Sequence, residues 1–140
     1  MYYSLEPEVS GRIGDDSDFD NSIHPPRVTK LNYVFDGWLG DSLIESFPCF
    51  IVTESLAKEI VEKGLLGCKF EECSTTTSEQ FNELHPNREL PNFLWLQVYG
   101  KLGVDDFSIS ETGMLVVSAT ALDVLNQSGI ENCEIEVYGI

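Results

Sequence analysis

The alternation of apolar and polar residues is clearest between residues 27 and 35. In RVTKLNYVF, the side chains of Leu31, Tyr33 and Phe35 fall on one side of an extended chain, while Lys30 falls on the other. A period of two with one apolar side is typical of a strand with one buried face. This segment is therefore predicted to form one half-buried strand.

The segments around this strand carry weaker signals. Residues 1–5, MYYSL, predict a short strand. Residues 6–26 contain Gly, Pro, Asp and Ser with little periodicity, so they predict a loop. After the strand, residues 36–41, DGWLGD, contain two turn-forming dipeptides, which predict a reversal of the chain.

Two segments of the chain resemble each other. FIVTESLAKEIVEKGLLGCKFEE begins at Phe50, and LVVSATALDVLNQSGIENCEIEV begins at Leu115, 65 positions later. Each contains an apolar run, a hydroxyl residue suited to cap a helix, an amphipathic stretch, a terminating glycine and a second apolar run. This internal repeat predicts two strand–helix–strand units with helices near residues 54–63 and 119–128. The predicted N-caps are Thr53 and Ser118, and the predicted terminating glycines are Gly64 and Gly129.

The remaining segments complete an α+β pattern. Residues 78–84 predict a short helix, and residues 107–109 predict an edge strand. NFLWLQVYG, residues 92–100, is apolar on both faces and predicts a central strand. We expect one domain over residues 1–140, with a mixed, mostly antiparallel sheet of about five to seven strands and two or three helices. Residues 1–26 would contribute a strand and an acidic loop, and residues 27–140 would contribute the core.

The charge of the chain is strongly negative. Twenty-four acidic residues against eight basic ones give a net charge of −16. Such a field repels phosphate backbones and anionic lipid heads, so neither nucleic acid nor a membrane is an expected partner. It favours a basic partner, or it serves solubility alone. The sequence MYYSLEPEVSG lacks the features of a secretory signal, which predicts a cytoplasmic protein with reduced cysteines.

The densest acidic stretch lies within GRIGDDSDFDNSIHPP, residues 11–26. Its spacing resembles the start of a calcium-binding loop, which requires a glycine at position six and a glutamate at position twelve. Counted from Asp16, these positions hold Asn21 and Arg27, so a calcium site is not expected. Two interpretations remain open, a solvated loop and a surface for a basic partner.

No arrangement of residues points to catalysis. The two histidines, His24 and His85, each precede proline in a loop-like segment. The four cysteines lack the spacing of a zinc site, and no phosphate-binding glycine motif is present. We therefore expect no metal, no cofactor and no enzymatic activity. A small hydrolase that uses paired carboxylates or Cys73 is the least favoured alternative.

Several longer segments resemble a bacterial family of small immunity proteins, which are encoded beside polymorphic toxins. These toxins include ones delivered by contact-dependent or secretion-system routes. The resemblance covers about residues 31–125, and it is strongest in three motifs. They are FDGWLGD (residues 35–41), PCFIVTE (residues 48–54) and GVDDF (residues 103–107).

The resemblance implies an α+β protein without catalytic residues that binds and neutralises one cognate toxin. Many such toxins act on nucleic acids and carry basic clefts, which an acidic inhibitor would cover.

Trp38 could be an exposed anchor for the toxin, or its ring could fold back onto the core. The alternative function is an acidic adaptor or nucleic-acid mimic that binds basic proteins more broadly. The candidate partner-binding residues are Asp15, Asp16, Asp18, Asp20, Trp38, Asp105 and Asp106.

Overall fold

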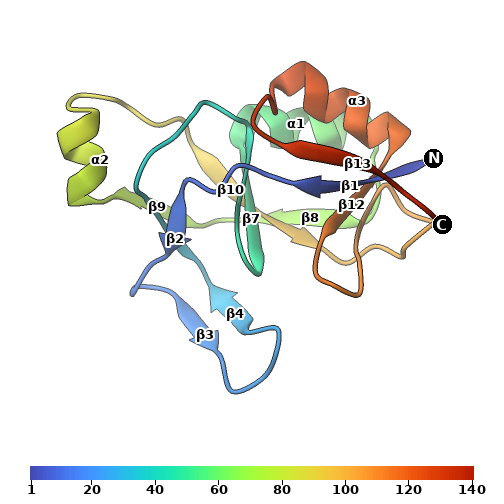
Figure 1. The fold of residues 1–140 in the computed structure, drawn as a ribbon, viewed down its shortest axis with the longest axis horizontal. Helices are drawn as coiled ribbons and strands as arrows, with labels where there is room; N and C mark the ends of the chain where they lie inside the picture. Colours follow the sequence, from blue (N-terminus) through green and yellow to red (C-terminus); the bar gives the residue numbers. More distant parts are fainter.

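Three helices and thirteen strands, arranged in four mostly antiparallel sheets, form the α+β fold (Figure 1). The computed structural model describes residues 1–140. The fold class is the predicted one, although the strands form four sheets and not a single one. The helices are α1 (Glu54–Glu62), α2 (Glu79–Leu84) and α3 (Ala119–Ser128). The strands are β1 (Tyr2–Glu6), β2 (Gly11–Ile13), β3 (Asp18–Asp20), β4 (Arg27–Lys30), β5 (Asn32–Phe35), β6 (Leu43–Ser46), β7 (Cys49–Thr53), β8 (Cys68–Glu71), β9 (Ser74–Thr77), β10 (Phe93–Val98), β11 (Phe107–Ile109), β12 (Leu115–Ser118) and β13 (Glu134–Tyr138).

The two four-stranded sheets share one arrangement. Their strand orders are β11-β12-β1-β13 and β6-β7-β10-β8. In each sheet a hairpin leads into a helix, and the strand after that helix forms the far edge. One antiparallel strand is inserted between them, β1 in one sheet and β10 in the other. Both predicted strand–helix–strand units are therefore confirmed, and each is completed by a strand from outside the repeat.

The register of strand pairing is also the same in the two sheets. Phe93 of β10 stands opposite Thr53, and Tyr2 of β1 stands opposite Ser118, which is the equivalent residue of the second unit. The match continues on the other side of the inserted strands, where β8 and β13 pair in equivalent registers. Strand β1 thus has the same structural role in the second unit that β10 has in the first.

The predicted helix ends are confirmed. The side chains of Thr53 and Ser118 accept hydrogen bonds from main-chain N–H groups of the first helical turn, at 3.3 and 3.1 Å. Gly64 and Gly129 follow their helices with φ angles of 66° and 103°. These positive φ values favour glycine because it has no Cβ to clash with the carbonyl group.

Helices α1 and α3 lie side by side and cover the inner faces of the two four-stranded sheets (Figure 1). Leu56 and Ile60 of α1 and Ala121 and Leu125 of α3 are fully or almost fully buried in the main core. Burial of these apolar side chains is the chief stabilising contribution of the helices. None of the three helices is long and apolar enough to cross a membrane.

A second core lies on the opposite face of the β6-β7-β10-β8 sheet. Tyr33 and Phe35 of β5 pack there with Phe81 of α2 and Trp95 of β10. Strand β5 belongs to a three-stranded sheet of order β2-β5-β9, in which β5 and β9 are parallel. The predicted apolar side of residues 27–35 is therefore the buried one.

Two predictions about the N-terminal third are wrong. Residues 27–35 form two strands, β4 and β5, and residues 6–26 include the strands β2 and β3. Strand β3 pairs with β4, so Asp18 stands opposite Lys30 and Asp20 stands opposite Arg27. Opposite charges attract across this pair, which offsets the poor strand propensity of aspartate. The expected boundary at residue 26 therefore falls inside a β-hairpin.

Candidate functional site

The acidic stretch forms part of a projecting hairpin, here called the arm (residues 15–30). Strands β3 and β4 extend from the body at the bottom of Figure 1. The four predicted contact residues of this stretch, Asp15, Asp16, Asp18 and Asp20, are all exposed. Hydrogen bonds from the side chain and main chain of Ser22 hold the pKa of Asp20 below its usual value.

The arm also exposes apolar side chains that sequence reasoning missed. Phe19 is 48% exposed and Ile23 is 50% exposed, both close to the aspartates. Phe19 alternates with two aspartates in DFD, so its position on a strand was hidden by the apparent loop composition. Exposed apolar side chains on the same hairpin as charged ones are a combination that protein interfaces use, with an apolar centre and a polar rim.

Trp38 lies against the second core. Its ring meets that of Phe93 edge-on at a centroid distance of 5.8 Å, and the guanidinium of Arg88 lies 4.9 Å from the Trp38 ring. The indole N–H donates a hydrogen bond to the carbonyl of Asp41 at 3.0 Å. Trp38 is half-buried, so of the two interpretations the structure favours the ring folded back onto the core.

Asp105 and Asp106 form hydrogen bonds within the chain. The carboxylate of Asp105 accepts from the N–H of Lys101 at 2.6 Å. Asp106 accepts from the N–H of Leu66 at 2.8 Å and from the hydroxyl of Ser118 at 2.7 Å. Both aspartates are partly buried. These bonds give them a structural role, and they lie in different elements from the aspartates of the arm.

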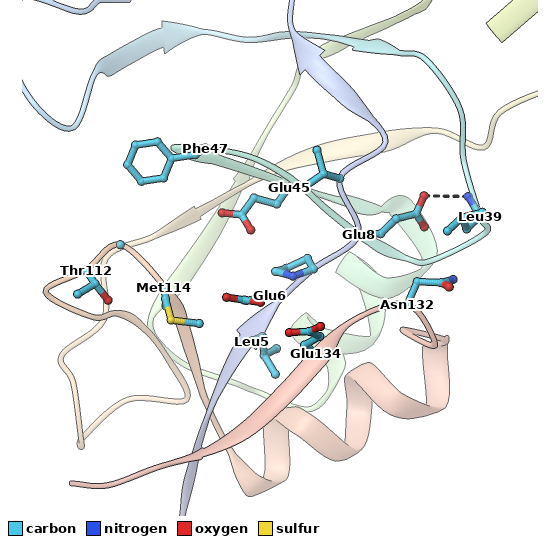
Figure 2. A pocket seen from close by; sticks show the side chains of 13 residues that line it. Leu5, Glu6, Glu8, Leu39, Glu45, Phe47, Thr112, Met114, Asn132 and Glu134 are labelled. Carbon is cyan, nitrogen blue, oxygen red and sulfur yellow. Dashed lines mark hydrogen bonds between the residues drawn. The ribbon is translucent and has the colours of Figure 1, made fainter.

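A cleft of about 520 Å³ brings together glutamates that the sequence did not single out (Figure 2). Glu6 of β1, Glu45 of β6 and Glu134 of β13 turn their carboxyl groups toward the same space. Glu6 and Glu134 stand directly opposite each other on paired strands. These three residues are called the glutamate cluster below.

Two members of the glutamate cluster, Glu6 and Glu45, have raised pKa values. A hydrogen bond with Glu134, together with the repulsion of its charge, raises the pKa of Glu6. Burial, followed by the nearby charge of Glu6, raises the pKa of Glu45 to about 7. No cation of the chain forms an ion pair with these carboxyl groups. A cation brought by another molecule would lower both pKa values.

Glu8 lines the same cleft and has a structural role. Its side chain is buried, and it accepts hydrogen bonds from the N–H groups of Leu39 at 2.8 Å and Asp41 at 3.3 Å. The hydroxyl of Ser10 donates to the same carboxylate. Figure 2 shows the bond from Leu39 as a dashed line. Glu8 therefore fixes the loop before β6 and leaves the cleft to the glutamate cluster.

An aromatic contact joins the cleft to the arm. Phe47, which lines the cleft, is 47% exposed, and its ring lies 6.0 Å from that of His24 in the arm. Met114 is another apolar side chain that lines the cleft (Figure 2). The arm and the cleft thus adjoin each other at this contact. We call the two together, the arm (residues 15–30) and the residues that line the cleft, the acidic face.

Cys49 is buried, the other three cysteines are partly buried, and all four have raised pKa values. Burial raises the pKa of Cys73 to about 11. Burial is also the main reason that the pKa values of Cys49, Cys68 and Cys133 are raised to about 12. All four are free thiols. A thiol with such a pKa stays protonated near neutral pH and is a poor nucleophile. No three side chains of His, Cys, Asp or Glu are grouped as metal ligands.

No protein-family model, no curated protein and no solved structure matches this chain.

Proposed function

We propose that the chain is an immunity-type protein that binds one cationic toxin in the cytoplasm and covers the toxin's active site. The observation that carries this proposal is the large number of carboxylates without a cation. Of 24 acidic residues, Asp36 and Glu54 alone form ion pairs within the chain, with Arg12 and Lys58. The positive charges complementary to this surface must therefore come from another molecule or from salt.

The acidic face supports binding to a protein in particular. Phe19 and Phe47 provide apolar contact area, and the carboxylates of the arm and of the glutamate cluster provide charge complementarity. Buried aromatic anchors commonly carry most of the binding energy of an interface, whereas exposed rim charges set the association rate. The acidic face combines both elements on one surface.

The negative field supports a toxin that acts on nucleic acid. Such an enzyme needs a basic cleft to hold phosphates, and an acidic protein is attracted to the same cleft. A net charge of −16 would accelerate the encounter at low ionic strength. Inhibition then requires occlusion only, which is in keeping with a chain whose cysteines are protonated thiols near neutral pH.

The same unpaired carboxylates also favour the alternative, an acidic adaptor or nucleic-acid mimic. The two functions differ in selectivity. A mimic binds unrelated basic proteins through charge alone, and its affinity falls steeply with salt. An immunity protein discriminates its toxin from other basic proteins, because shape and apolar contacts add to the charge.

The experiment compares the toxin module encoded by the neighbouring gene with two unrelated basic proteins of similar size. We expect an equimolar complex with the toxin alone at physiological salt, together with restored growth of cells that express the toxin. The variant Glu6→Gln/Glu45→Gln/Glu134→Gln should bind about tenfold more weakly, since it removes the glutamate cluster. Its matched control replaces the same number of glutamates at exposed positions around α2. The control substitutions are Glu79→Gln, Glu83→Gln and Glu89→Gln.

Each outcome decides the question. Equal binding of all three basic proteins would support the mimic, and failure to bind or neutralise the toxin would refute the immunity function. Equal weakening by the cluster variant and the control variant would show that net charge, and not the acidic face, determines affinity.

A further inference from the structure

The two four-stranded sheets each end in an open edge strand at equivalent positions. Strand β8 pairs only with β10, and strand β13 pairs only with β1. In an antiparallel pair, alternate residues direct their N–H and C=O groups away from the partner strand. Such an edge is a template for a further strand from another molecule. The repeat therefore allows a direct comparison of two equivalent edges within one chain.

The β13 edge opposes pairing with itself. Its sequence is Glu134-Ile135-Glu136-Val137-Tyr138. If two copies paired antiparallel about Ile135, Glu134 of one copy would stand opposite Glu136 of the other. A two-fold axis at Glu136 would place that residue opposite itself. Directly opposed like charges destabilise a strand pair, so this edge repels a second copy.

The β8 edge has the reverse property. Its sequence is Cys68-Lys69-Phe70-Glu71. A two-fold axis at Phe70 places Lys69 of each copy opposite Glu71 of the other and brings the two Phe70 side chains together. Lys69 and Glu71 are both exposed and form no ion pair within the chain. Their charges are therefore available for an antiparallel second copy.

The surface next to β8 supports the same pairing. A groove of about 410 Å³ lies between α1 and the sheet, and its apolar residues are Ala57, Val61, Phe70 and Leu94. Val61 is 66% exposed, whereas the equivalent residue of α3 is the polar Asn126. The apolar patch is thus a property of the first unit only. In the two-fold arrangement both patches lie on the same side of the joined sheet, where they can exclude water together.

We propose that the chain forms a two-fold dimer through β8, which joins two four-stranded sheets into one eight-stranded sheet. This proposal goes beyond the toxin-binding function and does not depend on it. The net charge of −16 on each copy opposes association at long range. Salt screens that repulsion beyond roughly 8 Å at physiological ionic strength, whereas opposed strand residues lie roughly 5 Å apart. The local complementarity of Lys69 and Glu71 therefore outweighs the distant repulsion.

The test is a charge exchange measured by analytical ultracentrifugation from low micromolar to near-millimolar concentration. We expect a monomer–dimer equilibrium for the wild type. Lys69→Glu and Glu71→Lys should each weaken the dimer at least about tenfold, since each replaces two attractive pairs by two repulsive ones. The double variant Lys69→Glu/Glu71→Lys should restore it. Lys30→Glu, with the same change in charge as Lys69→Glu but on the arm, should leave the dimer unchanged.

Amide hydrogen exchange of the wild-type chain gives an independent reading that needs no variant. Protection of residues 68–71 should rise with protein concentration, while that of residues 134–138 should not. A chain that stays monomeric at every concentration would overturn the proposal. So would a dimer that the double variant fails to restore, or one that protects β13 or the arm in place of β8.

Discussion

The buried carboxylate of Asp41 accepts hydrogen bonds from the main-chain N–H and the side-chain amide of Asn132, at 2.8 and 2.9 Å. Asp106 binds the N–H of Leu66 in the corresponding way. Asp41 precedes β6 and Asp106 precedes β11, the two strands that form hairpins with the first strands of the repeated units, and each aspartate binds the segment after the helix of the other unit. The two units are therefore tied together by a reciprocal pair of aspartates.

We expect Asp41→Ala to lower the free energy of unfolding by about 2–4 kcal/mol. Asp41 is only 2% exposed, and its loss leaves two nitrogen donors of Asn132 without their charged acceptor. Asp15→Ala removes the same charge from an exposed position and should have almost no effect. Urea denaturation of both variants measures the difference, and equal midpoints would contradict a stabilising role for the Asp41 carboxylate.

The repeated units could be predicted from sequence because their signals are local. A capping hydroxyl such as Thr53 and a terminating glycine such as Gly64 specify helix ends through contacts within a few residues. The inserted strands could not be predicted in this way. Nothing near β1 or β10 in the sequence specifies which strands each will pair with, because those partners come from distant segments and the choice depends on the whole core.

The candidate site was predictable only in part. The exposed aspartates of the arm follow from composition, since a dense run of charge must remain in solvent. Trp38 and Asp106 have partners in distant segments, and sequence shows neither Phe93 beside the indole nor Leu66 beside the carboxylate. The three residues of the glutamate cluster come from three strands that are far apart in the sequence. Among 24 acidic residues, no local signal distinguishes its members from solvated glutamates.

The equivalence of β1 and β10 predicts that the chain tolerates circular permutation. Tyr138 stands opposite Tyr2, so a direct bond from Ile140 to Met1 leaves a three-residue hairpin loop that includes Gly139. With new termini between Pro86 and Asn87, in an exposed loop, we expect the same circular dichroism spectrum and cooperative unfolding. A control permutant with new termini inside β10 should fail to fold. Loss of cooperative unfolding in the first permutant would contradict the structural equivalence.

Glu45→Gln should stabilise the protein at neutral pH by about 1 kcal/mol. Its pKa is raised from 4.5 to about 7 in the folded state, so the folded chain binds the proton more tightly than the unfolded chain. The contribution of the Glu45 carboxyl group to the free energy of unfolding is therefore fully present below pH 4.5, and it is lost as the pH rises toward about 7. The expected gain in stability is well below the free energy that corresponds to the whole pKa shift of Glu45, because solvent screens a half-exposed carboxyl group.

The measurement is thermal or urea unfolding between about pH 4 and pH 8. The Glu45→Gln variant should show a flatter dependence on pH than the wild type over this range, with the largest difference near the upper end. Glu111→Gln, at an exposed position, provides the control and should follow the wild-type curve. A Glu45→Gln curve parallel to that of the wild type would show that Glu45 titrates like an ordinary glutamate.

Trp38→Ala should destabilise the fold by about 2–3 kcal/mol. The substitution removes the edge-on contact with Phe93, the stacking of Arg88 and the hydrogen bond to the Asp41 carbonyl. The expected loss is smaller than for a fully buried tryptophan, since the ring is half-buried. Denaturation midpoints and toxin dissociation rates should be measured together. Unchanged stability with faster dissociation would instead identify Trp38 as an interface anchor.

The arm should determine how fast the toxin binds, and its apolar residue should determine how long the complex lasts. Changing Asp15, Asp16, Asp18 and Asp20 together to asparagine should slow association about tenfold at low salt and flatten its salt dependence. The global free energy of unfolding should change little, because all four side chains are exposed and the cross-strand contacts of Asp18 and Asp20 lie within the arm. Phe19→Ala should instead speed dissociation, since it removes the exposed ring among these charges.

Stopped-flow association and dissociation rates with the cognate toxin, each at two salt concentrations, separate these effects. The Glu79→Gln/Glu83→Gln/Glu89→Gln variant serves as the control for lost charge outside the acidic face. If the quadruple variant associates at the wild-type rate at low salt, the arm lies outside the interface. If Phe19→Ala slows association and leaves dissociation unchanged, the ring does not act as an anchor, and the division of roles between charge and apolar contact within the arm is wrong.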